Sequence, residues 1–209
     1  AFTFQPDAKE AEIQQLHAVC KEAELGMVSR LDVKPRTPGE LINCLRRFRR
    51  RFEVIAVLCE SKPVARQAAK DRRVDILNFP AYDFRGRFFD MAEAELASKS
   101  LASFEIDLRP LLVLEGSTRA KLLSSLRREV AVAKSFHVPI VISSGVSDKL
   151  LMRKPREQAA LTSLFDLDEA TAVDAVSANP VAIVERNRKK LCAGFVAPGI
   201  SLVRRGKDC

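Results

Sequence analysis

Residues 103–112, SFEIDLRPLL, decide the fold, because they place three charged side chains on one face of a strand that the flanking sequence predicts to be buried. Side chains alternate along a strand, so the residues divide into an apolar and a charged set: Phe104, Ile106 and Leu108 against Glu105, Asp107 and Arg109. Pro110 then ends the strand. A parallel strand covered by helices normally reads as an apolar run. The charged face therefore predicts either an internal ion network or a surface offered to a partner.

Strand and helix patterns alternate on both sides of this stretch. Strands are expected at residues 2–4, 27–33, 53–58, 74–79, 104–108, 139–143 and 199–203, with helices between them and three consecutive helices at 155–165, 168–178 and 180–193. This order predicts right-handed crossovers and a parallel sheet. We expect one α/β domain over residues 1–209, a TIM-barrel-like (β/α) barrel of about seven parallel strands with extra C-terminal helices. A five-stranded open sheet stays as the alternative.

The composition favours an anionic partner. Lys and Arg together number 35 against 27 Asp and Glu, which gives a net charge of +8 and a pI near 9.5. No run approaches the roughly 18 apolar residues of a membrane span, and the first residues lack the pattern of a signal peptide. The five cysteines are scattered with no C-x-x-C pair, which indicates a reducing compartment, and we expect a cytoplasmic protein.

An enzyme interpretation depends on polar residues at the strand ends. Barrel enzymes act from the C-terminal ends of their strands. The polar residues that this chain offers there are Asp32, Glu60, Asn78, Asp107, Ser143 and Ser144. The chain has only two histidines, His17 and His137, each expected to be structural, so a histidine-based metal centre is not predicted. No phosphate-binding glycine loop or serine nucleophile motif occurs.

Two interpretations of Glu105 and Asp107 remain open from the residues. They could begin a carboxylate-only magnesium site of a free-standing barrel hydrolase. They could instead pair with arginines inside the barrel, and Arg188, in the apolar seam of its helix, is the expected partner together with Arg30. We expect the ion network of Glu105, Asp107 and Arg188, with no catalytic residue and no metal ligand in this chain.

The positive charge is concentrated after the strands and on the late helices. The densest run lies at residues 46–51, where a solvated helix end and phosphate contact are both reasonable interpretations. Arg85 and Arg87 follow the fourth strand, and further cations follow the fifth and sixth. Many of these cations are expected to gather at one end of the barrel. The candidate RNA-binding residues are Arg109, Arg119, Lys149, Arg153, Lys154, Arg186 and Lys190.

Five segments resemble one family in their order and spacing: VDILNFP (74–80), FEIDLRPLL (104–112), VPIVISSG (138–145), IVERNRKKL (183–191) and PGISLV (198–203). The family is that of the third protein component of archaeal ribonuclease P, which includes the thirty-kilodalton subunit of the eukaryotic enzyme. The resemblance runs from about residue 50 to the end. It implies a barrel-like fold without the histidine metal site of related hydrolases.

The resemblance also implies a role. In this family the chain belongs to a ribonucleoprotein that removes 5′ leaders from precursor tRNA, and the RNA holds the catalytic magnesium ions. The expected partners are the ribonuclease P RNA and a small ferredoxin-fold protein subunit, with one or two copies of each, the latter a heterotetramer; precursor tRNA would be met indirectly. Arg109 and Arg119 carry over as RNA-facing residues. A nucleic-acid chaperone outside ribonuclease P is a further alternative.

Overall fold

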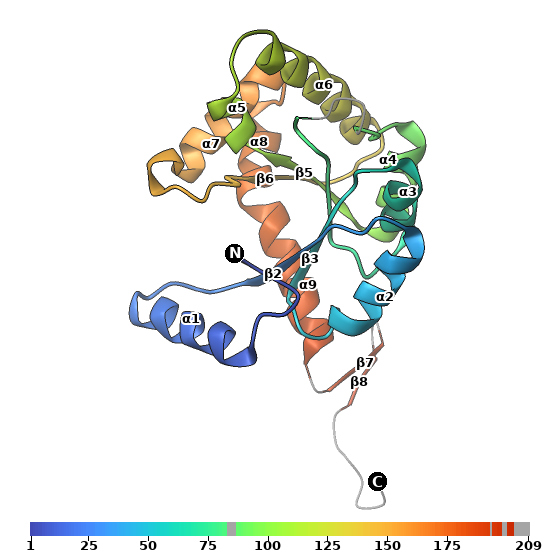
Figure 1. The fold of residues 1–209 in the computed structure, drawn as a ribbon, viewed down its shortest axis with the longest axis vertical. Coiled ribbons are helices and arrows are strands. Elements are labelled where there is room, and N and C mark those ends of the chain that lie inside the picture. The colour runs from blue at the N-terminus through green and yellow to red at the C-terminus, as the bar shows by residue number, and fades with distance from the viewer. Residues whose placement is uncertain (83–86, 193, 198–199, 203–209) are drawn as a thin grey trace, which may run out of the picture.

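The computed structural model describes residues 1–82, 87–192, 194–197 and 200–202. Six strands form one parallel sheet in chain order: β1 (Phe2–Phe4), β2 (Ser29–Val33), β3 (Val54–Leu58), β4 (Ile76–Asn78), β5 (Ser103–Asp107) and β6 (Ile140–Ser143). The sheet curls into a half-barrel (Figure 1), which confirms the TIM-barrel-like α/β fold. Within the described residues β1 and β6 are its two edges.

Helices follow the strands as a (β/α) fold requires. They are α1 (Glu10–Glu22), α2 (Pro38–Phe48), α3 (Lys62–Lys70), α4 (Met91–Ser100), α5 (Arg109–Val113), α6 (Gly116–Ser135), α7 (Pro155–Leu161), α8 (Glu169–Val176) and α9 (Ala178–Leu191). Two 3₁₀ turns, η2 (Lys149–Leu151) and η3 (Thr162–Phe165), flank α7. The predicted capping residue Thr37 accepts the Glu40 N–H at 3.2 Å and starts α2. In the described residues no helix is both long and apolar enough to cross a membrane.

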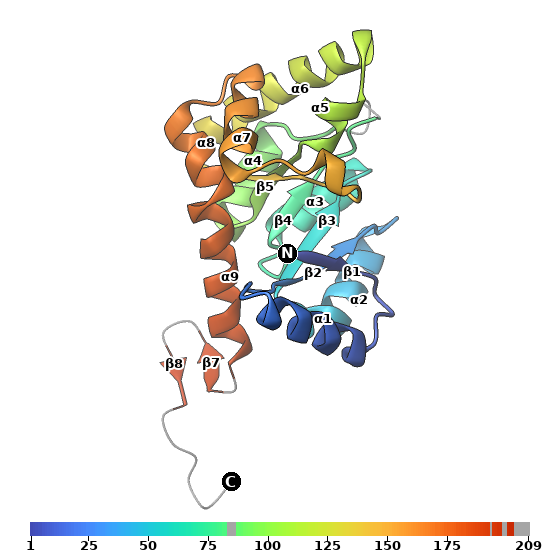
Figure 2. The same cartoon turned by 90° about the vertical axis from the view of Figure 1, so that its left-hand side faces the viewer.

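The seventh strand corrects the prediction. β8 (Ile200–Ser201) pairs antiparallel with β7 (Phe195–Ala197) in a separate hairpin and does not join the barrel sheet. Gly199 and Val203, which the predicted strand included, lie outside the described residues. The cause is α9, which carries the chain along the length of the molecule to the far end from α8 (Figure 2). The described strands therefore form an open half-barrel.

The two faces of the sheet bury different things. Leu31, Ile55, Leu77 and Phe104 face outward into the main apolar core and are fully buried. Alternate positions face the inside of the curl, where Val54, Ala56, Ile76 and Val141 pack with Ile183 of α9. Burial of one Val, Leu, Ile or Phe side chain contributes about 1.5–3 kcal/mol to the free energy of folding. The inner face is thus apolar where α9 covers it, and its polar residues lie nearer the C-terminal strand ends.

Helix α9 is fastened to successive strands at their N-terminal ends. Asn179 donates to the Ile140 carbonyl at the start of β6 at 2.8 Å. One residue beyond Arg186, Asn187 donates to the Glu53 carbonyl just before β3 at 2.8 Å. These bonds, and further ones described below, fix α9 across the N-terminal ends of the strands, which we call the lower end of the half-barrel. The C-terminal ends of the strands, the upper end, are not covered by α9.

Candidate nucleic-acid interface

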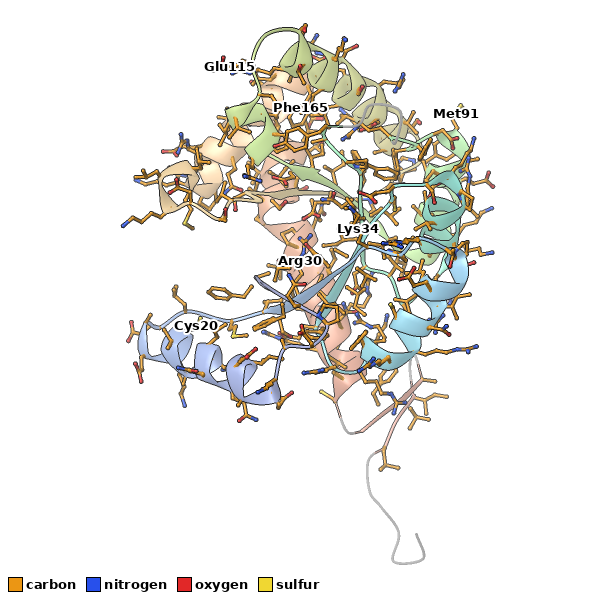
Figure 3. All side chains as sticks on the ribbon, viewed as in Figure 1. Cys20, Arg30, Lys34, Met91, Glu115 and Phe165 are labelled. Atoms are coloured by element: carbon orange, nitrogen blue, oxygen red, sulfur yellow. The ribbon has the colours of Figure 1, made fainter. Side chains whose placement is uncertain are left out.

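An ion network lies on the inner face of the sheet, nearer the C-terminal strand ends than the apolar contact with α9. Arg30 donates to both oxygens of Glu105, with Nη1–Oε1 and Nη2–Oε2 distances of 2.5 and 2.7 Å. Asn78 donates to Oε2 of the same carboxylate at 2.8 Å, and Arg30 Nε donates to Asp32 Oδ1 at 2.6 Å. The Glu105 side chain has no exposed surface, and Figure 3 shows Arg30 near the centre of the molecule.

The network accounts for the charge of Glu105. Burial acts to raise the pKa of Glu105, but the hydrogen bonds and charge of Arg30, together with Asn78 and Ser143, outweigh it and lower the pKa. Glu105 is therefore ionised and both its oxygens are engaged. Among the described residues, no three His, Cys, Asp or Glu side chains are placed to hold a metal ion together. The geometry does not favour the magnesium-dependent hydrolase.

Asp107 has a different environment from the one expected for it. Its Oδ1 accepts the backbone N–H of Arg109 at 2.9 Å, and no ion pair joins it to an arginine among the described residues. Burial raises the pKa of Asp107 to about 6, the nearby charge of Glu105 also raises it, and the Arg109 N–H acts against that shift. Asp107 shapes the turn between β5 and α5 and is not part of the paired network.

Arg188 also departs from the expectation. Its Nε donates to Glu53 Oε1 at 2.6 Å and its Nη2 donates to the Met27 carbonyl at 3.0 Å. Both partners precede strands, so Arg188 fastens α9 to the N-terminal ends of β2 and β3. The predicted apolar seam is wrong, because Val181 and Arg188 are exposed and α9 buries Ile183 and Asn187 instead. Arg188 lies at the N-terminal ends of the strands, away from Glu105.

Five of the predicted RNA-binding residues follow the C-terminal ends of β5 and β6. Arg109 begins α5 and is exposed, and Arg119 lies on the first turns of α6, where its Nε donates to the Leu114 carbonyl. Lys149 belongs to η2, and Lys154 is the N-cap residue of α7. Arg153, between them, donates from Nη1 to the Leu150 and Met152 carbonyls at 3.1 and 3.0 Å. We call these five residues the upper cations.

A surface hollow brings two of the contributing segments together. It has a volume of about 730 Å³, and Leu112 of α5 and Arg153 both line it, with Leu161 and Leu164. The loops after β5 and β6 therefore border one concavity. In Figure 1 α5 and α7 lie near each other, and Figure 3 shows Glu115, beside the start of α6, at the margin of the molecule. Arg153 is the one upper cation that lines the hollow, beside Glu157, and the other four follow the same two strands outside it. Cations on separate loops at one end of a sheet are suited to follow a phosphate backbone.

Arg186 and Lys190 do not join the upper cations. Arg186 donates to Asp75 Oδ1 at 3.2 Å and to the Leu101 carbonyl at 3.0 Å, and both partners lie just before strands. Lys190 is one helical turn further along α9 and is half-buried. The cations are therefore divided between the two ends of the half-barrel, whereas the sequence predicted that many would gather at one.

The grouping of Arg87 with the cations at one end of the barrel was also wrong. This side chain is buried and makes a two-pronged ion pair with Glu129 of α6, with Nε–Oε1 at 2.8 Å. The signal was present in the sequence, because Glu129 falls on the same helix stripe as Leu122, Leu126 and Val130. A carboxylate on an apolar stripe requires a buried cation. Arg85 lies outside the described residues.

Comparison with known proteins identifies the family of the chain. The family described as RNase P subunit p30 matches residues 3–191, nearly the whole chain. The chain belongs to this ribonuclease P subunit family. Ribonuclease P protein component 3 of Methanosarcina mazei is 33% identical over 178 residues, which cover 85% of this chain and 73% of the relative. The corresponding protein of Methanocaldococcus jannaschii is 27% identical over 154 residues, which cover 73% of this chain and 66% of that relative.

A solved structure shows the same fold. One chain of a cryo-EM structure of archaeal ribonuclease P with mature tRNA superposes with a TM-score of 0.87, and the match covers 99% of this chain and 90% of that one. The two sequences are 23% identical. The half-barrel and its C-terminal helices are therefore a fold that the two chains share.

Proposed function

We propose that this chain is the RNA-scaffolding protein subunit of a ribonuclease P, and that the upper cations contact the phosphate backbone of its RNA. The observation that carries the proposal is the contrast between the two kinds of charge. The strand-face carboxylate Glu105 is neutralised internally by Arg30, whereas Arg109, Lys149 and Lys154 are exposed. The chain offers binding charge outward and keeps its buried acid paired.

The chemistry in this proposal belongs to the RNA. The RNA would hold the magnesium ions for removal of the 5′ leader from precursor tRNA, and this chain would support the RNA together with a small ferredoxin-fold subunit. Exposed apolar side chains beside the upper cations, Leu150 and Met152, are 76% and 63% exposed and fit such a protein contact. Two observations support this assignment: the relatives are named as ribonuclease P protein components, and the chain with the same fold comes from a ribonuclease P structure that contains mature tRNA.

The test is reconstitution of cleavage from purified parts. The cognate RNA, the small protein subunit and this chain are combined with precursor tRNA, and cleavage is compared for wild type, Arg109→Gln and Arg153→Gln. Each variant should weaken RNA binding and reduce the slope of log affinity against log salt by about 1 per lost phosphate contact. Lys21→Gln, an exposed change on α1, is the charge-matched control. Cleavage by the isolated chain without RNA would overturn the proposal.

A further inference from the structure

Two cations pair with one carboxylate at the N-terminal end of the sheet, and two more lie in the same neighbourhood. Asp75, just before β4, is buried, and its Oδ2 accepts from Arg49 Nη1 at 2.8 Å while its Oδ1 accepts from Arg186 Nη2 at 3.2 Å. Lys190 and Arg72 lie close by. Burial, followed by the charges of Arg186, Arg49 and Arg72, lowers the pKa of Lys190. We call Arg49, Arg72, Arg186 and Lys190 the lower cations.

The charge in this cluster is not balanced from within. Both oxygens of Asp75 are already engaged, and Oδ2 also accepts the Ile55 N–H at 2.9 Å. In the part of the chain that the structure describes, neither Arg72 nor Lys190 has a carboxylate within 4 Å. Asp75 is the carboxylate that these cations pair with, so the four lower cations and Asp75 together carry a net charge of about +3.

Two further features make this excess costly in the isolated chain. Arg186 and Lys190 are four residues apart on α9, a spacing at which like charges destabilise a helix. The Nε of Arg186 is buried and has no hydrogen-bond partner among the described atoms. An anion placed beside these side chains would relieve the repulsion between them.

The surroundings favour an extended polyanion over a single small ion. Arg46 and Arg50 lie near Arg49 in the sequence and Lys189 precedes Lys190, and all three side chains are exposed. Glu185 on α9 is one exposed negative charge against these three positive charges, so the positive charge still dominates. A nucleic-acid backbone presents successive phosphates at a spacing that such a surface can follow.

We propose that the lower cations are a second RNA-phosphate site, so that the subunit joins two RNA segments at opposite ends of the half-barrel. The inference rests on the proposed function of the upper cations. Five-residue strands such as β3 and β5 span about 16 Å at roughly 3.3 Å per residue. The two sites are separated by the length of the sheet, so one phosphate group cannot occupy both.

The experiment measures bridging by the full chain. Two short RNA duplexes, one carrying a donor dye and the other an acceptor, are mixed with wild type, with the lower variant Arg72→Gln/Lys190→Gln, or with the upper variant Arg109→Gln/Arg153→Gln. Wild type should bring the dyes together. The lower variant should bridge the two duplexes about tenfold less well than wild type, while its affinity for a single duplex should stay within about twofold. For bridging, the slope of log affinity against log salt should be smaller by roughly 2, one for each cation removed.

A control pair of equal charge separates the site from net charge. Lys9→Gln/Lys21→Gln, on exposed positions at α1, should leave bridging unchanged. A lower variant that behaves like this control overturns the second site, including the case in which the cluster binds an acidic protein instead. An upper variant that behaves like the control while the lower variant loses binding contradicts the proposed function and leaves the second site standing.

A measurement on the unaltered chain covers the case in which a variant fails to fold. Acylation of lysines by an amine-reactive ester is followed by mass spectrometry with and without the RNA duplex. RNA should slow modification of Lys190 at least about threefold and leave Lys21 unaffected. Equal rates at Lys190 with and without RNA would overturn the proposal.

Discussion

Arg30 on β2 reaches across β3 and β4 to form a two-pronged ion pair with Glu105 on β5. The pair therefore braces the curl of the sheet over four strands, and Asn78 on β4 supports it from between. Because an arginine fork matches the two oxygens of a carboxylate, this pair is also a geometric constraint on the strand positions.

Removing one partner of this pair should destabilise the fold strongly. Arg30→Met leaves Glu105 buried and uncompensated, and we expect a loss of about 3–5 kcal/mol in the free energy of unfolding. The double variant Arg30→Met/Glu105→Leu should recover most of the loss. Urea denaturation measures both. Lys34→Met, which breaks the exposed pair with Glu60, is the control and should cost less than about 1 kcal/mol. Equal effects of the two methionine variants would contradict the brace.

The raised pKa of Asp107 predicts a pH dependence. The folded value is about 6 against 3.8 for the free side chain, so the folded state binds more protons between these values. The contribution of Asp107 to stability is then present below about pH 3.8 and is lost as the pH rises through 6. Relative to wild type, Asp107→Asn should gain stability between pH 4 and pH 7, measured by urea denaturation across that range.

Glu95 supplies a comparison of opposite sign. Lys99 lowers the pKa of Glu95, so its contribution is lost as the pH falls. Glu95→Gln should therefore lose stability relative to wild type toward neutral pH. If Asp107→Asn followed the same trend as Glu95→Gln, the burial of Asp107 would not be the cause of its shift.

Gly145 should tolerate no side chain. Its φ is +56°, a left-handed value that favours glycine, and a Cβ there would overlap the Asp107 carboxylate, which the Arg109 N–H holds in place. Gly145→Ala should lower the thermal midpoint by several degrees and weaken RNA binding, because the loops after β5 and β6 would move apart. Gly26→Ala, with open space around its Cα, is the matched control and should have the smaller effect.

Arg87 and Arg153 should separate structural from RNA-facing arginines. Arg87→Ala leaves Glu129 buried without its partner and should cost about 3–5 kcal/mol. Arg153→Ala should change stability by less than about 1 kcal/mol and weaken RNA binding. Thermal unfolding and RNA titration in parallel check both. A stable Arg87→Ala variant with weakened RNA binding would assign Arg87 to the surface instead.

The strands could be predicted because their patterns are local. Alternation in SFEID and the apolar run VIAVL each fix a strand and its faces, and every expected strand from residues 2 to 143 appears in the sheet. Helix starts were equally local, as at Thr37 and Pro38. The five-residue α5 was not expected, because Pro110 also reads as a strand end.

The partners of charged residues could not be predicted in the same way, since they depend on where α9 crosses the sheet. Arg188 and Arg186 lie on a helix whose apolar pattern gave neither its buried side, which is that of Ile183 and Asn187, nor its position along the strands. Their carboxylates, Glu53 and Asp75, are more than a hundred residues earlier in the chain. The buried Arg87–Glu129 pair shows the opposite case, where one residue on an apolar stripe signals a missing partner.

The attachment of α9 to residues just before β2, β3 and β4, and to the first residue of β6, has a consequence for synthesis of the chain. These anchors come from its last quarter, so the early strands leave the ribosome before the helix that ties them together exists. Contacts of such long sequence separation form slowly. The nascent half-barrel would expose Val54, Ala56 and Ile76 until α9 docks, so we expect docking of α9 to be the step that completes the native inner face.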